Sequence, residues 1–125
     1  MAVRLYRSMK QDRDQQPLCE PSARGLGARV PVDIETDKND EVHPFTGGMS
    51  VAPNTPKNLR PWRRPPKFGG YGRDPVFYMD DEAVREPLQY MPDGPAHGMI
   101  EPGVVMALET YQTTLCETRE QWRLA

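Results

Sequence analysis

The stretch Thr46-Gly47-Gly48-Met49-Ser50-Val51-Ala52 joins a glycine pair to a hydroxyl and a short β-prone run. Glycine lets the backbone approach a bulky group closely, although a glycine pair is also typical of a plain turn. The chain opens on a second β-prone run, Val3-Arg4-Leu5-Tyr6-Arg7. Arg7 closes that run, where its planar guanidinium could meet a phosphate or simply lie in solvent. Together the two runs predict two strands that contribute to one site.

The length of 125 residues predicts a single domain over residues 1–125. The 14 prolines and 10 glycines follow no period, which indicates a loop-rich fold. A net charge of −2 argues against polyanion binding by the chain as a whole, local patches aside. Cations interrupt the N-terminal residues and no long apolar run follows, so we expect neither a signal peptide nor a transmembrane segment. This pattern predicts a cytoplasmic protein.

Hydrophobic patterning predicts three further strands, at residues 75–79, 88–91 and 96–101. The turn Asp93-Gly94 is expected to join the last two in a hairpin. Residues 28–35 alternate valine and isoleucine with Arg29, Pro31 and Asp33, which predicts a half-buried strand that Pro31 keeps at an edge. Asp80 is expected to cap a short helical turn that runs to residue 85.

The C-terminal segment carries a helical period. Its apolar residues recur at three- and four-residue steps and form one stripe: Leu108, Tyr111, Leu115, Cys116 and Trp122. We interpret this helix as core architecture and assign the chain to the α+β class. The only other cysteine is Cys19. The chain has no CxxC motif and no histidine cluster, so we expect no metal site. We expect both thiols to be reduced, although the sequence alone leaves a single disulfide between them open.

Residues 53–73, which we call the strap, are rich in proline and contain no carboxylate. Six cations there are interleaved with aromatic residues: Lys57, Arg60, Arg63, Arg64, Lys67 and Arg73. Loops of this length are usually functional or disordered. One interpretation is a phosphate-binding segment; the other is a stiff surface strap whose Trp62 and Phe68 are pinned to the core.

His97 and Glu101 are the candidates for acid and base chemistry. Alternate residues of a strand point to one face, so both side chains could reach one cleft. The alternative is a structural histidine beside a surface glutamate.

The order of four phrases resembles a family of interbacterial toxins. The phrases are Leu5-Tyr6-Arg7, Gly47-Gly48-Met49-Ser50-Val51, His97-Gly98-Met99-Ile100-Glu101-Pro102 and Arg119-Glu120-Gln121-Trp122-Arg123. The family comprises small type VI secretion effectors with an ADP-ribosyltransferase-like fold, and it also includes free-standing cytoplasmic toxins paired with immunity proteins. The resemblance spans almost the full chain.

The resemblance implies a small split antiparallel β-sheet that binds NAD across a cleft, with a long Pro/Arg-rich loop and a C-terminal helix. It implies that Arg7 contacts the NAD phosphates or ribose, that Ser50 supports the cleft and that Glu101 serves as the acid. Glu101 precedes Pro102, which departs from the glutamate motif of well-known members. The resemblance also implies that an immunity protein is the partner and that the toxin is delivered into a target cell. The macromolecular target is unknown, and the reaction is either transfer of ADP-ribose to that target or hydrolysis of NAD.

Further cofactor contacts follow from the residue types beside this cleft. Tyr6 or Tyr78 could stack on the nicotinamide ring, and the Gly48 backbone could approach it. Arg63 and Arg64 could reach the phosphates if the strap folds over the cleft.

Two other functions stay open. In one, the chain is a non-enzymatic protein that uses residues 53–73 to clamp nucleic acid or an acidic protein, and salt should weaken such binding steeply. In the other, the chain is a loop-rich subunit that becomes ordered only within an assembly.

Overall fold

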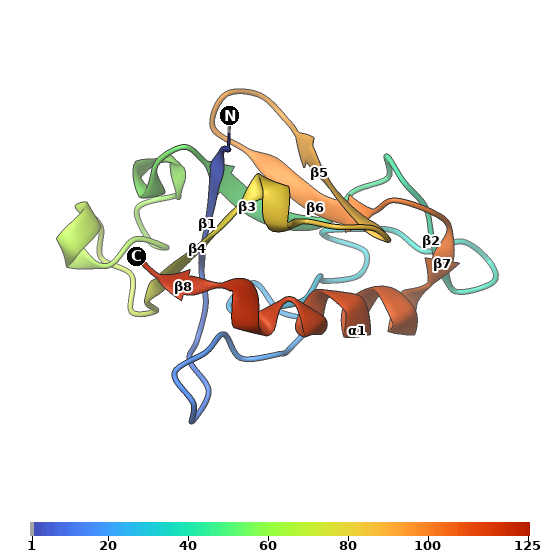
Figure 1. The fold of residues 1–125 in the computed structure, drawn as a ribbon, viewed down its shortest axis with the longest axis horizontal. Helices are drawn as coiled ribbons and strands as arrows, with labels where there is room; N and C mark the ends of the chain where they lie inside the picture. The colour runs from blue at the N-terminus through green and yellow to red at the C-terminus, as the bar shows by residue number, and fades with distance from the viewer. Residues whose placement is uncertain (1) are drawn as a thin grey trace.

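A computed structural model describes residues 2–125. Its centre is a six-stranded antiparallel sheet in the order β5-β6-β3-β1-β4-β8 (Figure 1). These strands are β1 (Arg4–Ser8), β3 (Met49–Pro53), β4 (Val76–Asp80), β5 (Leu88–Pro92), β6 (Gly98–Pro102) and β8 (Arg123–Leu124). The short strands β2 (Glu41–Val42) and β7 (Met106–Ala107) form a second sheet. The fold is therefore α+β, and the predicted strands at both opening runs and in the 88–101 hairpin are confirmed.

The central sheet splits between β1 and β3. Strand β1 pairs with β4 along its whole length, from Arg4↔Asp80 to Ser8↔Val76. It pairs with β3 only at Leu5↔Pro53 and Tyr6↔Ala52. In Figure 1, β1 runs down the view from the N-terminus, whereas β3 and β6 extend across it toward β2 and β7. Beyond Tyr6, side chains and loops must therefore fill the space between the two strands.

The helix α1 (Leu108–Glu117) covers one face of the sheet, as its apolar stripe predicts, but it ends before Trp122, which follows the 3-10 turn Arg119–Gln121. Tyr111 and Leu115 are fully buried there. The Tyr111 hydroxyl donates to the Ile100 carbonyl at 2.6 Å and accepts from the Met49 amide at 3.1 Å. Burial raises the pKa of Tyr111, so the hydroxyl keeps its proton and ties α1 to two strands. Within residues 2–125, no helix is both long and apolar enough to cross a membrane.

The strap is a long loop, as predicted, with two short 3-10 turns, Pro56–Asn58 and Pro66–Phe68. Leu59 and Phe68 pack against a small cluster of Tyr6, Ala52 and Val76 on the opposite face of the sheet from α1. Trp62, in contrast, is 55% exposed, so the interpretation that it is pinned to the core is wrong. The strap is thus anchored at two side chains and leaves its tryptophan free.

The edge strand predicted at residues 28–35 is wrong. Arg29 and Asp33 close a turn, since the Asp33 amide donates to the Arg29 carbonyl at 2.8 Å. The Asp33 carboxylate accepts the Arg29 amide as well, at 2.7 Å. Val30 and Val32 consequently lie in solvent, and only Ile34 of the alternating set is buried. Local side-chain hydrogen bonds outweighed the strand pattern here.

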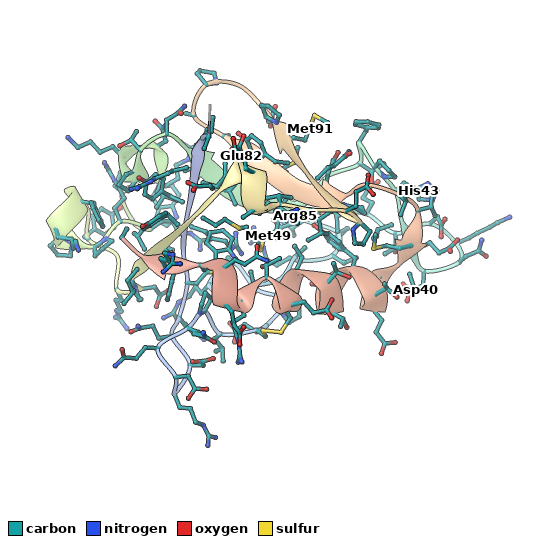
Figure 2. All side chains as sticks on the ribbon, viewed as in Figure 1. Asp40, His43, Met49, Glu82, Arg85 and Met91 are labelled. Carbon is teal, nitrogen blue, oxygen red and sulfur yellow. A yellow bond between two sulfur atoms is a disulfide. The ribbon has the colours of Figure 1, made fainter. Side chains whose placement is uncertain are left out.

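Two smaller expectations also need correction. The segment after Asp80 is a single 3-10 turn, Asp81–Ala83, and Asp80 makes no side-chain cap. Cys19 and Cys116 are joined in a disulfide, visible as the yellow bond beside α1 in Figure 2, where reduced thiols were expected. They lie 97 residues apart in sequence, so only the folded chain brings them together.

A cationic cavity at the split of the sheet

A cavity of about 690 Å³ lies where β1 and β3 diverge, and the strap forms its outer wall. We call it the main cavity. Six cationic side chains line it: Arg7, Arg29, Lys57, Arg60, Arg63 and Arg64. Asp33 is the one carboxylate among the lining residues, and Ser50, Trp62 and His97 complete the polar and aromatic wall. The excess of positive charge suits an anionic ligand.

Arg7 forms the inner wall of the main cavity and is only 6% exposed. Its Nη1 donates to the Ser50 carbonyl at 2.7 Å. Its Nε and Nη2 donate to the Gly25 carbonyl at 3.1 and 2.8 Å, and Nη2 also reaches the Ser22 carbonyl at 3.1 Å. Burial lowers the pKa of Arg7 to about 10. Arg7 therefore braces the loop at residues 22–27 against β3, while its charge faces the cavity.

Ser50 and His97 reach the main cavity from neighbouring strands. Ser50 lies on β3 opposite Met99 of β6, and its hydroxyl has no hydrogen-bond partner within residues 2–125. His97 directly precedes β6, and its Nδ1 lies 3.2 Å from an Asp93 oxygen. The structure thus brings Arg7, Ser50 and His97 to one cavity, although they come from three distant parts of the sequence.

Asp33 and Arg29 form a two-point ion pair in the cavity wall. Arg29 Nη2 lies 3.0 Å from Asp33 Oδ1, and Arg29 Nε lies 3.1 Å from Oδ2. The hydrogen bonds that Arg29 donates to the Asp33 carboxylate raise the pKa of Arg29. Because each charge compensates the other, the pair adds little to the net potential of the cavity.

The strap contributes Arg63 and Arg64 to the main cavity. Arg63 donates to the Ala23 carbonyl, and burial together with the nearby charge of Arg29 lowers its pKa. The Nε atom of Arg64 is buried without a hydrogen-bond partner within residues 2–125. Both guanidinium groups are therefore short of compensating anions, a condition that a bound phosphate would relieve.

Glu101 lies outside the lining of the main cavity. It is fully buried, and its oxygens accept from the Gln89 Nε2 at 2.6 Å and from the Phe45 amide at 3.2 Å. Four residues along a strand span about 13 Å, which separates it from His97. Glu101 belongs to β6, the neighbour of β3 in the sheet, and both of its oxygens have a protein partner.

Three other candidates from the sequence also lie outside the lining. Gly48 packs against β6, where a Cβ would come within 2.7 Å of the Ile100 carbonyl. Tyr6 is buried in the small cluster under Leu59 and Phe68 of the strap, and Tyr78 lies beneath Arg4, whose guanidinium carbon is 4.4 Å from the ring centroid. Gly48 is therefore needed for the packing of β3 against β6, and neither tyrosine is among the residues that line the main cavity.

Sequence reasoning missed several lining residues. The sequence places three of them, Trp62, Lys57 and Arg60, in a charged and aromatic strap. Their positions in the cavity wall depend on how the strap folds. Arg29 and Asp33 carried a detectable signal, because opposite charges four residues apart can pair across a turn. The valine alternation between them obscured that signal.

Comparison with known proteins gives one match. Residues 3–122 match the family model described as "Tse2 ADP-ribosyltransferase toxin". No curated protein and no solved structure matches the chain. The match covers almost the whole chain and includes every residue of the main cavity.

Proposed function

Because the chain belongs to the Tse2 ADP-ribosyltransferase toxin family, we propose that it is a toxin that binds NAD in the main cavity and breaks the bond between nicotinamide and ribose. The observation that carries the proposal is the cationic cavity at the split of the sheet, where Arg7 and Ser50 meet. The split sheet also agrees with the ADP-ribosyltransferase-like fold that we propose for the chain.

The residues present fit a dinucleotide. The cavity volume of about 690 Å³ lies within the usual range for small-molecule sites, roughly 300–1,000 Å³. NAD carries a diphosphate, and the lining offers Arg63 and Arg64, neither of which makes an ion pair within residues 2–125, while Arg64 Nε is buried without a hydrogen-bond partner there. We propose that these two strap residues hold the diphosphate and that Arg7 sets the inner wall against which the ligand rests.

The reaction requires stabilisation of positive charge on the ribose as nicotinamide leaves, and a carboxylate serves this need in related sugar chemistry. Two carboxylates are candidates. Asp33 lines the cavity, but Arg29 already compensates its charge. Glu101 has only neutral hydrogen-bond donors, but its side chain lies outside the lining. We retain Glu101 as the proposed acid, with Ser50 and His97 as the groups that orient the ribose and the acceptor.

The biological setting follows from the family resemblance. We propose that the toxin acts in the cytoplasm of a target cell after delivery by a secretion system, and that a cognate immunity protein neutralises it in the producing cell. The strap forms the outer wall of the cavity, so we propose that the immunity protein binds over the strap and keeps NAD from the cavity.

The test is nicotinamide release by the purified protein, combined with killing of a sensitive host. Ser50→Ala removes a hydroxyl that has no partner in the fold, so we expect an unchanged melting temperature. Loss of one group that acts in the transition state should lower nicotinamide release by about 100-fold. Thr113→Ala, which removes an exposed hydroxyl from α1, is the matched control and should keep full activity.

Two results would overturn the proposal. One is a folded wild-type protein that neither releases nicotinamide from NAD nor kills the host. The other is full activity in both Ser50→Ala and His97→Ala, which would remove the site from the split of the sheet.

A further inference from the structure

A second, smaller pocket of about 270 Å³ adjoins the main cavity. The two share Trp62 and Arg63, so a ligand in one lies next to a ligand in the other. Ser8, Arg24, Tyr71, Gly72, Arg73 and Asp74 complete its lining. We propose that this side pocket holds the acceptor of the ADP-ribose group and that the acceptor is single-stranded nucleic acid. The inference rests on the proposed function and names the macromolecule on which it acts.

Two exposed aromatic side chains line the side pocket. Trp62 is 55% exposed and Tyr71 is 70% exposed. Neither belongs to the two hydrophobic clusters of the fold, so core packing does not account for them. Exposed aromatic rings beside cationic groups are the usual platform for stacking of unpaired bases. The pair therefore suits a nucleobase held against the strap.

The charges around the side pocket favour phosphate. Arg24 and Asp74 form a bidentate pair, with nitrogen-to-oxygen distances of 2.6 and 2.8 Å, and they compensate each other. Arg73 remains, because Arg63 is assigned to the NAD diphosphate in the main cavity; Arg73 is exposed and makes no hydrogen bond or ion pair within residues 2–125. An uncompensated guanidinium group thus lines the same pocket as two aromatic rings, a combination that suits the phosphate and the base of a nucleotide.

An acidic protein would use the same cations but would gain little from the rings. Carboxylates bind arginine without stacking, and they would leave Trp62 and Tyr71 in water. A double helix presents its bases edge-on inside grooves, so the rings could not stack on them. The aromatic pair is therefore the feature that favours single-stranded nucleic acid over both alternatives.

The transfer step balances without a further reactant. A nucleophilic oxygen or nitrogen of the nucleic acid attacks C1′ of the ribose, and the bond between C1′ and the nicotinamide nitrogen breaks. The electron pair of that bond leaves with nicotinamide, which departs as a neutral molecule. The proton of the acceptor passes to water. Water as the nucleophile would give simple hydrolysis of NAD.

The experiment measures binding and transfer with a fluorescein-labelled 12-nucleotide single strand, as DNA and as RNA, on the full chain. Wild-type protein should bind the strand, and the affinity should fall steeply as salt rises. Tyr71→Ala and Arg73→Ala should each weaken binding about tenfold and abolish labelling of the strand by ADP-ribose from NAD. Tyr71→Phe keeps the ring and should restore both. Nicotinamide release without the strand should be unchanged in all three variants.

Arg13→Ala is the matched control, because Arg13 is an exposed arginine in the turn at residues 12–16, lines neither pocket and should bind like the wild type. The inference is overturned if the wild-type protein releases nicotinamide but neither binds nor labels the strand, an outcome that leaves the proposed function intact. It is also overturned if a glutamate-rich peptide or a double strand competes as well as the single strand. Binding of the strand without any nicotinamide release would reject the proposed function instead.

Discussion

Arg7 shows how one buried charge can shape a site. Its guanidinium donates to the carbonyls of Ser22, Gly25, Gly27 and Ser50, which joins a loop to β3 at the point where β1 and β3 separate. A planar fork with five donors suits this task, whereas an ammonium group does not. The residue that the sequence indicates as a phosphate ligand is therefore also part of the framework.

Arg7→Ala should lower the free energy of unfolding by about 3 kcal/mol, because buried carbonyls would lose a charged donor. Arg7→Lys should recover only part of that loss. Urea denaturation of the purified variants measures both values. Arg13→Ala should change the free energy of unfolding by less than about 0.5 kcal/mol. A fully stable Arg7→Ala variant would show that these carbonyls do not depend on the guanidinium.

Glu101 allows a structural role to be separated from a catalytic one. In Glu101→Gln, the new side-chain NH2 group would face either the Gln89 side-chain NH2 or the Phe45 backbone N–H, so that two donors meet. This mismatch should lower the free energy of unfolding by about 1–3 kcal/mol. The double variant Glu101→Gln with Gln89→Glu restores a matched pair with the charge moved to β5. We expect it to melt near the wild-type temperature but to release no nicotinamide.

The double variant decides between the two roles of Glu101. Recovery of both stability and nicotinamide release would mean that the carboxylate acts only as a structural acceptor, and would leave Asp33 as the candidate acid. Recovery of stability alone supports catalysis by Glu101. The melting temperature of each variant is the control, since inactive but unfolded protein would carry no information.

At the level of elements, the disulfide joins α1 to the loop that surrounds Arg7. Cys19 lies three residues before Ser22, the first residue whose carbonyl accepts from the guanidinium, and Cys116 lies on the helix. The bridge closes a loop of 97 residues, so its removal should cost about 2–5 kcal/mol, mainly through the entropy of the unfolded chain. The double variant Cys19→Ala with Cys116→Ala tests this by urea denaturation.

A reducing agent provides the control for the disulfide. Dithiothreitol should destabilise the wild-type protein to about the level of the double variant and should leave the double variant unchanged. Equal stability of the oxidised wild-type protein and the double variant would contradict the expected contribution of the bridge.

The elements also show what the sequence can and cannot predict. The opening strand, the hairpin at residues 88–101 and α1 have periods that extend over several residues, and the structure confirms them. The turn at Arg29 and Asp33 shows an alternating pattern, but hydrogen bonds between those two residues determine its shape. The main cavity depends on where a strap without periodicity lies, and no local pattern encodes that position. The pairing of Cys19 with Cys116 likewise depends on the folded chain.

On the scale of the whole molecule, the strap closes the cavity at the end of the fold opposite β2 and β7 (Figure 1). Backbone hydrogen bonds hold its two arms together, from the Tyr71 amide to the Pro61 carbonyl at 3.0 Å and from the Gly72 amide to the Arg64 carbonyl at 2.7 Å. Gly70 lies between these arms, where a Cβ would overlap the carbonyl oxygens of Arg64 and Pro61. The position of the cavity wall therefore depends on a glycine far from any strand.

Gly70→Ala should separate the arms of the strap and move Arg64 out of the cavity wall. We expect the Kd for NAD, followed by tryptophan fluorescence, to rise about tenfold, equivalent to about 1.4 kcal/mol. Gly69→Ala is the matched control: Gly69 has a φ of +80° but open space around it, so that variant should lose stability through backbone strain and keep its affinity for NAD. Equal loss of affinity for NAD in both variants would mean that backbone strain in the strap, and not its close packing, determines the position of the cavity wall. Unchanged affinity in both variants would mean that NAD binds without the strap.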